Sequence, residues 1–407
     1  MSASGRPGRV LFAGQAYYNT WYLSRALREL GWRADVLNWD STPGMEGFYH
    51  GEDFSFRFDG RRDAARQVRF WLRALRSYDV FHFSNMHGLR FGPYLHDLFS
   101  RFFGDGGDVR LLKRLGKKIV YSNNGCLDGV AQSSFASWGD RPVCLDCAWR
   151  NRPDICSDEG NLAWGRLRNE LADFQVTTGG NRVDYNDDPR VHEVPEFYCL
   201  DPDFWRPGLE IPAERRLDLP AETVKIYHAV GNLKARSGAE HEHYRNIKST
   251  HIYLPLIERL KEEGHDVELI FFSDVPNREV RFYQAQADIV CDMLTFGFFG
   301  AGVREAMMLG KPVVCYLRPE WLQQMRAEIP SYVEELPVVS ATPETVHDVL
   351  AGLVGDPARR EELGRRGREF ALKWHSADVG ARRLSTIYAN LMAGRPGSDD
   401  FRSQEER

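Results

Sequence analysis

Short apolar runs and segments with helical spacing alternate along the first half of the chain. Residues 9–14 form an apolar, β-prone run that ends in Gly14. Residues 20–30 then place apolar side chains at helical spacing, and residues 33–38 return to a strand pattern. Further strands are expected at residues 80–83, 118–121 and 176–178. Strands and helices in this order predict a doubly wound α/β domain.

A second series of the same kind follows a stretch rich in proline and aspartate. Strands are expected at residues 224–229, 267–272, 288–292 and 311–316, and helices at residues 250–264, 280–285, 303–309, 345–354 and 361–374. The pattern predicts a first domain over residues 1–200, a linker over 201–221 and a second domain over 222–376. A terminal helix is expected at residues 377–392, followed by a disordered polar tail at 393–407.

Length and composition agree with a two-domain soluble protein. The chain has 407 residues, of which 43% are hydrophobic and 27% charged, and its net charge of −5 argues against a dedicated nucleic-acid binder. No apolar run approaches the roughly 18–20 residues that span a bilayer. The first residues also lack the long apolar region of a signal peptide. We therefore expect a cytoplasmic protein with reduced cysteines.

The segment 287–316 has the most informative pattern. A short strand is followed by a turn that contains Gly297, Gly300 and Gly302, then by a short helix and a second strand. Glycines before a helix allow backbone N–H groups and the positive end of the helix to approach an anionic ligand. This pattern alone predicts a strand–turn–helix unit with affinity for anions.

The residues of this segment, EAMMLGKPVV at the helix and second strand, resemble the nucleotide-sugar site of retaining family 4 glycosyltransferases. The resemblance implies the GT-B fold, with two Rossmann-like doubly wound domains facing a central cleft and a terminal helix that returns to the first domain. It also implies a nucleoside diphosphate sugar as donor, retention of anomeric configuration and no catalytic metal. The family has two glutamates with seven residues between them. The second maps to Glu305, which would bind the nucleotide ribose, and the first maps to Gly297.

A pair of cations precedes the predicted helix 250–264. Arg245 and Lys248 are three residues apart and can converge on one diphosphate, or they can form a solvated pair on a helix face. The family has a strand ending in His-Ala and then an RxxKGT motif, which favours the diphosphate role. Here His228 ends the strand and Ser249 replaces the usual glycine.

The resemblance therefore implies a complete set of donor-site residues. Asp292 is the carboxylate nearest to the missing first glutamate, and it either compensates for that glutamate or caps the strand end. The residues implied in catalysis are Glu305, Lys248, Arg245 and Asp292. The residues implied in donor contacts are Gly14, His228, Gly297, Gly300, Ala301, Gly302 and Glu305.

Two segments of the first half resemble strands whose ends face the acceptor in this family. They are DVFH at residues 79–82 and KKIVYSNNGCLD at residues 117–128. His82, Asn124 and Asp128 are implied on the acceptor side. The family's usual histidine before the glycine is Asn124 here, so no general base is assigned. The acceptor is expected to be a glycan, a lipid-linked sugar or a small molecule.

Residues 61–118 carry a marked positive charge. They contain thirteen Lys or Arg against five Asp, and aromatic residues are interleaved among them. Such a face suits peripheral contact with an anionic membrane, at its inner face, and a lipid-linked acceptor. The alternative is a set of ordinary amphipathic helices with solvated arginines.

Four of the seven cysteines lie within residues 126–156, in a long insertion with weak periodicity. Cys126, Cys144, Cys147 and Cys156 have the spacing C-x17-C-x2-C-x8-C, which fits a tetrahedral structural zinc site. Unpaired buried thiols are a second interpretation, and an iron–sulfur or redox role is a third.

Two other functions remain open at this stage. A non-hydrolysing sugar-nucleotide epimerase has the same architecture but needs further carboxylates and a histidine in the cleft. A catalytically silent sugar-nucleotide binding subunit would explain why Gly297 replaces the first glutamate. Turnover of the donor distinguishes the silent subunit from a transferase.

Overall fold

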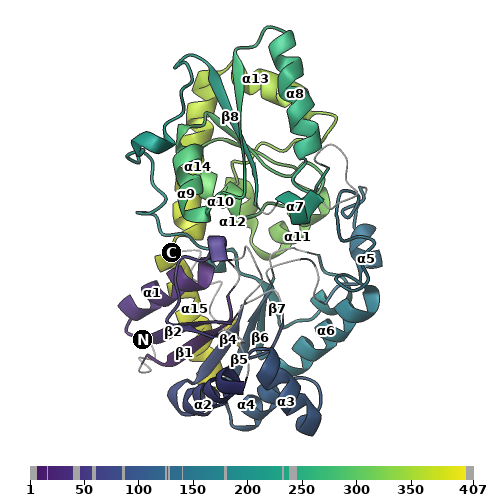
Figure 1. Ribbon diagram of the computed structural model, residues 1–407, viewed down its shortest axis with the longest axis vertical. Helices are drawn as coiled ribbons and strands as arrows, with labels where there is room; N and C mark the ends of the chain where they lie inside the picture. The colour runs from purple at the N-terminus through teal and green to yellow at the C-terminus, as the bar shows by residue number, and fades with distance from the viewer. Residues whose placement is uncertain are drawn as a thin grey trace.

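The computed structural model describes residues 7–399, except 16, 40–45, 57–60, 85–87, 124–125, 127–128, 140, 178–180, 232 and 238–244. The described strands form two parallel sheets, one of seven strands and one of four. Figure 1 shows one sheet in each half of an elongated molecule, with helices packed around both. The α/β class predicted from the sequence is confirmed.

The first sheet has the strand order β3-β2-β1-β4-β5-β6-β7. Its strands are β1 (Arg9–Ala13), β2 (Arg33–Asn38), β3 (Phe54–Ser55), β4 (Val80–Phe83), β5 (Lys118–Ser122), β6 (Phe174–Thr177) and β7 (Val191–Glu193). Its helices are α1 (Asn19–Glu29), α2 (Arg61–Ser77), α3 (Pro93–Phe103), α4 (Gly107–Arg114), α5 (Gln132–Ala136) and α6 (Asp158–Leu171). The order in which the chain adds strands to the sheet reverses between the parallel neighbours β1 and β4, and parallel sheets bind ligands beyond the carboxyl ends of their strands at such a point.

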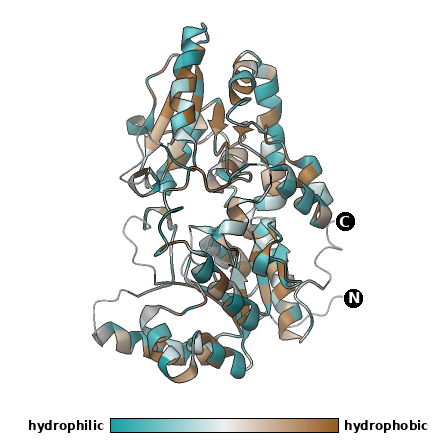
Figure 2. Ribbon diagram, turned by 90° about the vertical axis from the view of Figure 1, so that its right-hand side faces the viewer, coloured by the Kyte–Doolittle hydropathy of each residue, from teal (hydrophilic) through white to brown (hydrophobic). Residues whose placement is uncertain are grey.

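The second sheet has the strand order β11-β10-β8-β9. Its strands are β8 (Val224–Val230), β9 (Val267–Ser273), β10 (Ile289–Cys291) and β11 (Val313–Val314). Its helices are α7 (Leu233–Ser237), α8 (Thr250–Glu262), α9 (Asn277–Gln286), α10 (Ala301–Met308), α11 (Pro319–Glu328), α12 (Pro330–Glu335), α13 (Val346–Val354) and α14 (Pro357–His375). The helices present mixed hydrophobic and hydrophilic positions, as Figure 2 shows, because one face of each packs inward.

The terminal helix returns to the first half of the molecule. α15 (Ala377–Met392) packs beside α1, and Trp32 Nε1 donates a hydrogen bond to Ser385 Oγ (2.9 Å). Residues 393–399 continue along this half, where Asn390 Nδ2 donates to the Asp399 carbonyl (2.6 Å). This differs from the disordered tail predicted from residue 393; residues 400–407 lie outside the described part.

The cysteine-rich insertion contacts both halves of the molecule. Its one helix among the described residues, α5, lies at the side of the molecule between the two halves (Figure 1). The ring of Phe135 in α5 packs against Phe296 of the second domain, and Arg141 pairs with Glu344 (3.0 Å). The insertion therefore bridges the two domains. No helix in the described part of the chain is long and apolar enough to cross a membrane.

Candidate functional site

A cation, a carboxylate and a helix start meet at the carboxyl end of the second sheet. Lys248 lies in the turn before α8, and its Nζ is 2.6 Å from Oδ1 of Asp292, which directly follows β10. Gly300 precedes α10, and a Cβ atom added there would be 3.5 Å from Lys248 Nζ and 3.9 Å from Asp292 Oδ2. The structure thus brings together three of the residues that the sequence singled out.

Glu305 lies one turn into α10 and is 2% exposed. Tyr18 Oη and Asn277 Nδ2 both donate to its Oε1, at 2.7 and 2.8 Å, and Gln284 Nε2 lies 3.4 Å from its Oε2. Burial raises the pKa of Glu305, and the hydrogen bonds from Asn277 and Tyr18 partly offset this rise. Because Tyr18 belongs to the first domain, this carboxylate lies where the two domains meet.

The turn between β10 and α10, with Gly300, Ala301 and Gly302, contributes backbone groups to the site. Ala301 and Gly302 form the first turn of α10, where N–H groups have no partner within the helix. A Cβ added at Gly302 would meet nothing within 4 Å, so this side of the turn is open. Gly14 follows β1 with φ +86° and lies at the reversal point of the first sheet.

Tyr227 in β8 is a site residue that sequence reasoning missed. Burial raises the pKa of Tyr227, and the charges of Glu305 and Asp292 raise it further, so the ring lies near both carboxylates. Its hydroxyl has no hydrogen-bond partner in the described part of the chain, and the whole residue is 3% exposed. A buried hydroxyl of this kind indicates that a polar ligand belongs beside it.

The neighbouring residue, His228, lies on the other side of the strand. Its Nε2 is 2.9 Å from Thr250 Oγ1, and its Nδ1 is 3.3 Å from the Cys291 carbonyl. Burial lowers the pKa of His228 to about 4, so the ring is neutral near pH 7. Since alternate side chains of a strand point to opposite faces, Tyr227 faces Glu305 whereas His228 anchors the start of α8.

Arg245 and Lys248 have different ion-pair partners in the structure. Arg245 Nε donates to Oδ1 of Asp146 (2.8 Å), in the cysteine-rich insertion. Asp146 is 2% exposed and also accepts from Thr295 Oγ1 (3.4 Å). Arg245 therefore joins the insertion to the second domain.

Gly297 holds a position that other residues cannot take. Its φ is +105°, and a Cβ added there would lie 2.6 Å from Nε of Arg318. Arg318 is fully buried and donates from Nη1 to the Trp138 carbonyl (2.6 Å), again in the insertion. The Arg318 side chain thus occupies the space into which a side chain at position 297 would extend.

Of the three acceptor-side residues, the structure describes His82, and it places His82 in the core. His82 is fully buried in β4, with Nδ1 2.6 Å from Tyr388 Oη of α15 and Nε2 bonded to Ser122 Oγ. Burial lowers the pKa of His82 to about 3. His82 therefore belongs to the core under α15 and does not face the cleft. Asn124 and Asp128 lie outside the described residues.

The four cysteines of the insertion are free thiols that lie near one another. Burial, together with the nearby Cys147 and Cys156, raises the pKa of Cys144 to about 12. Cys126 also interacts electrostatically with the other three, and Cys147 N donates to the Cys144 carbonyl (3.2 Å). Nevertheless, no group of three or more His, Cys, Asp or Glu is placed to hold a metal ion among the described residues.

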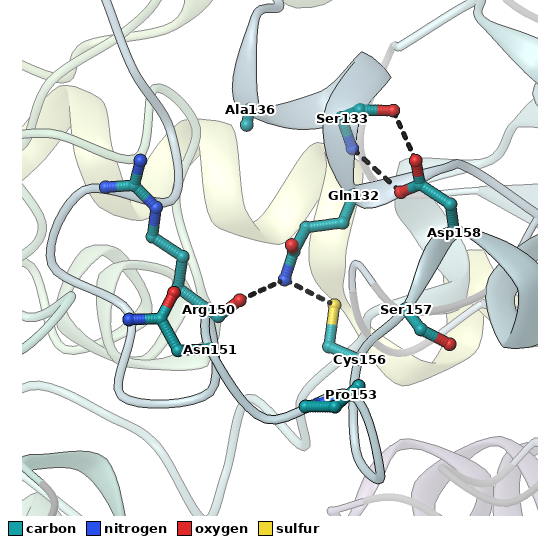
Figure 3. A pocket seen from close by; sticks show the side chains of 9 residues that line it. All are labelled: Gln132, Ser133, Ala136, Arg150, Asn151, Pro153, Cys156, Ser157 and Asp158. Carbon is teal, nitrogen blue, oxygen red and sulfur yellow. Dashed lines mark hydrogen bonds between the residues drawn. The ribbon is translucent and has the colours of Figure 1, made fainter.

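An open cavity of about 580 Å³ lies in the insertion beside Cys156 (Figure 3). Gln132 crosses it, donating from Nε2 to the Arg150 carbonyl (2.8 Å) and to Cys156 Sγ (3.3 Å). Asp158, at the start of α6, accepts from Ser133 at its rim. These contacts order the insertion around its last cysteine.

Comparison with solved structures identifies the fold. Sucrose-phosphate synthase from Thermosynechococcus elongatus is 14% identical, with a TM-score of 0.59 over 96% of this chain and 100% of its own. Anabaena HepE in complex with UDP and glucose is 12% identical, with a TM-score of 0.56 over 94% of this chain and 99% of its own. No protein-family model and no curated protein matches the sequence. The fold is GT-B, as predicted: two Rossmann-like domains facing a central cleft.

Proposed function

We propose that this protein is a glycosyltransferase that moves a sugar from a nucleoside diphosphate sugar to an acceptor, with retention of anomeric configuration. The single observation that carries the proposal is the meeting of Lys248 with the N-terminal turn of α10, one turn before the buried carboxylate of Glu305. The HepE structures with UDP and with UDP-glucose support it, because their fold is the same.

The proposed reaction needs a charged leaving group to be stabilised. The bond from the anomeric carbon to the β-phosphate oxygen breaks, and that oxygen leaves with the electron pair on the nucleoside diphosphate. The Lys248 ammonium and the N–H groups of Ala301 and Gly302 stabilise the charge that develops there. An acceptor hydroxyl oxygen forms the new bond and releases its proton; no residue is assigned as its base.

Glu305 would hold the nucleotide by its ribose. A carboxylate accepts hydrogen bonds from two adjacent hydroxyls, and the Tyr18 hydroxyl, 2.7 Å away, occupies one of these acceptor positions in this structure. In the proposed complex the ribose hydroxyls take the place of Tyr18. Arg245 is left with a structural role, since its partner is Asp146.

Release of nucleoside diphosphate from UDP-glucose, with and without sugar acceptors, tests the proposal. A transferase releases UDP faster when an acceptor is added. An epimerase changes the sugar of the donor without any acceptor, and a silent binding subunit binds the donor without releasing UDP. Failure of a panel of nucleotide sugars to yield any nucleoside diphosphate would contradict the proposal.

The acceptor is proposed to reach the enzyme at an anionic membrane surface. In α3, Phe102 is 75% exposed and Phe103 43% exposed, and Arg101 beside them is also exposed. Aromatic side chains enter the interface of a bilayer, and arginines bind its anionic headgroups. We expect the protein to sediment with vesicles that contain phosphatidylglycerol and not with phosphatidylcholine vesicles.

The double variant Phe102→Ser/Phe103→Ser is expected to reduce this sedimentation about tenfold, because each ring buries apolar area when it enters the membrane interface. Leu372→Ser is the matched control, since Leu372 is an exposed apolar residue (39%) of α14 in the other domain. Equal sedimentation with both kinds of vesicle would contradict the membrane proposal.

Structural zinc in the insertion stays a prediction, with the mutual proximity of the four thiols as its support. The protein purified without chelator is expected to contain about one zinc per chain, because four thiolates complete a tetrahedral site. The double variant Cys144→Ser/Cys147→Ser should contain none, whereas Cys199→Ala, which removes a buried thiol elsewhere, should retain it. Elemental analysis that finds no zinc in the wild-type protein would exclude the site.

A further inference from the structure

We propose that Asp292 binds a hydroxyl of the donor sugar, and that it makes the site selective for neutral sugars over sugars that carry a carboxylate. The inference rests on the proposed function and specifies the substrate class of the same site. It gives Asp292, at the end of β10, a sugar-binding role that a side chain at position 297 cannot perform in this chain.

Position 297 cannot supply a polar side chain. Any residue other than glycine would be strained at φ +105°, and its Cβ would collide with Arg318, which is fully buried. Arg318 is held there by the Trp138 carbonyl of the other domain. A sugar lying against this turn must therefore find its hydrogen-bond acceptor on another element.

Asp292 has an acceptor atom available at the right place. The residue is 5% exposed, and Oδ1 is bonded to Lys248 Nζ at 2.6 Å. Oδ2 is buried and has no hydrogen-bond partner among the residues that the structure describes. A Cβ added at Gly300 would lie 3.9 Å from Oδ2, so this oxygen is next to the start of α10.

The nearby Tyr227 hydroxyl is a second buried polar atom without a described partner. A buried polar atom costs about 1–3 kcal/mol when it is left unpaired. A ligand with several hydroxyls would satisfy both. The Lys248 ammonium pairs with Oδ1 of Asp292 and, in the proposed complex, also faces the leaving diphosphate.

The charge of Asp292 sets the expected selectivity. An ionised carboxylate only accepts hydrogen bonds, so it binds a sugar hydroxyl and repels a sugar carboxylate. Among the described residues, the cation paired with its carboxylate is Lys248, which the donor diphosphate also uses in the proposed complex. A donor whose sugar is a uronic acid would place its carboxylate beside that of Asp292, with no further cation paired there, in the described part of the chain, to neutralise the two.

The test compares the wild-type protein with Asp292→Asn, which keeps the shape and removes the charge. The value of kcat/KM for UDP-glucose is expected to fall roughly 10- to 100-fold. The ratio of kcat/KM for UDP-glucose to that for UDP-glucuronate should fall as well, because the repulsion is gone. Affinity for UDP alone, measured by calorimetry, should change less than threefold, since UDP lacks the sugar.

Glu335→Gln is the matched control, because Glu335 also accepts from a lysine at 2.6 Å, on the surface of the second domain. Unchanged turnover in Asp292→Asn, with melting at the wild-type temperature, would overturn the inference. A loss of UDP affinity equal to the loss of turnover would also overturn it, because Asp292 would then act only through Lys248. If the wild-type protein bound no nucleotide, the proposed function itself would fail, which is a separate result.

Discussion

Replacement of Lys248 by alanine is expected to reduce the affinity for a nucleoside diphosphate about 100-fold. The Lys248 side chain is 17% exposed, and a charge-assisted contact with phosphate contributes about 1.5–3 kcal/mol in such a setting. The substitution also leaves the Asp292 carboxylate buried without its cation, beside the anionic ligand. Titration calorimetry with UDP measures the change, and kcat/KM for the donor should fall at least as far.

Lys373→Ala provides the matched control. Lys373 Nζ is also 2.6 Å from a carboxylate, that of Glu335, but the pair lies on the surface at α14. This variant should bind UDP as the wild-type protein does, because an exposed pair contributes little and is distant from the site. Equal affinities for UDP in Lys248→Ala and Lys373→Ala would show that Lys248 does not bind the diphosphate.

Replacement of Glu305 by glutamine is expected to reduce nucleotide affinity about tenfold and to change its pH dependence. Burial raises the pKa of Glu305 above its usual 4.5, and the wild-type protein should lose affinity as the pH falls towards that raised value. The reason is that the protonated carboxyl no longer accepts from two ribose hydroxyls. Glutamine does not titrate, so the remaining affinity should be independent of this group.

Folding stability should show the opposite dependence on pH. Because the pKa of Glu305 is higher in the folded than in the unfolded protein, the folded state binds more protons between the two values. The contribution of Glu305 to the free energy of unfolding therefore decreases as the pH rises through this window. Urea denaturation at several pH values should show this slope in the difference between the free energies of unfolding of the wild-type protein and Glu305→Gln. The nearby His50 contributes the opposite slope over part of this range, because burial lowers its pKa to about 3 in the folded protein, but both proteins contain it, so its contribution cancels in the difference.

The segment 287–316 could be predicted from the sequence because its signals are local. Glycines, β-prone runs and the position of Glu305 in a short helix all depend on neighbouring residues, and the structure places β10, α10 and β11 in that order. The ion pair of Lys248 with Asp292 was not predicted, since Asp292 directly follows β10 whereas Lys248 lies in the turn before α8, 44 positions earlier in the chain.

Which side of β8 faces the ligand could not be predicted, and for this reason His228 and not Tyr227 was predicted to contact the donor. The strand reads VKIYHAV and is covered on both sides, so its pattern does not alternate between apolar and polar positions. Which of the two aromatic residues faces the ligand depends on the helices that pack on each side of the sheet. Only the contacts of Tyr227 with the charges of Glu305 and Asp292 decide it.

The partners of Arg245 and His82 could not be predicted because they are distant in the chain. Arg245 pairs with a residue 99 positions away, and His82 with Tyr388, 306 positions away. Both partners belong to segments that cross between domains, the insertion and α15. Sequence spacing contains no information on such contacts, so local motifs could not show that these two residues pair with distant segments.

The central claim is that the cleft of this GT-B fold binds a nucleoside diphosphate at Lys248 and Glu305. Thermal melting of the protein with UDP, GDP, ADP or dTDP, each alone, tests it most directly. A nucleotide at about 100 times its dissociation constant adds about 2.7 kcal/mol to the free energy of unfolding. The account predicts that one nucleotide raises the melting temperature of the wild-type protein and has no such effect on Lys248→Ala. An unchanged melting temperature with all four nucleotides would contradict it.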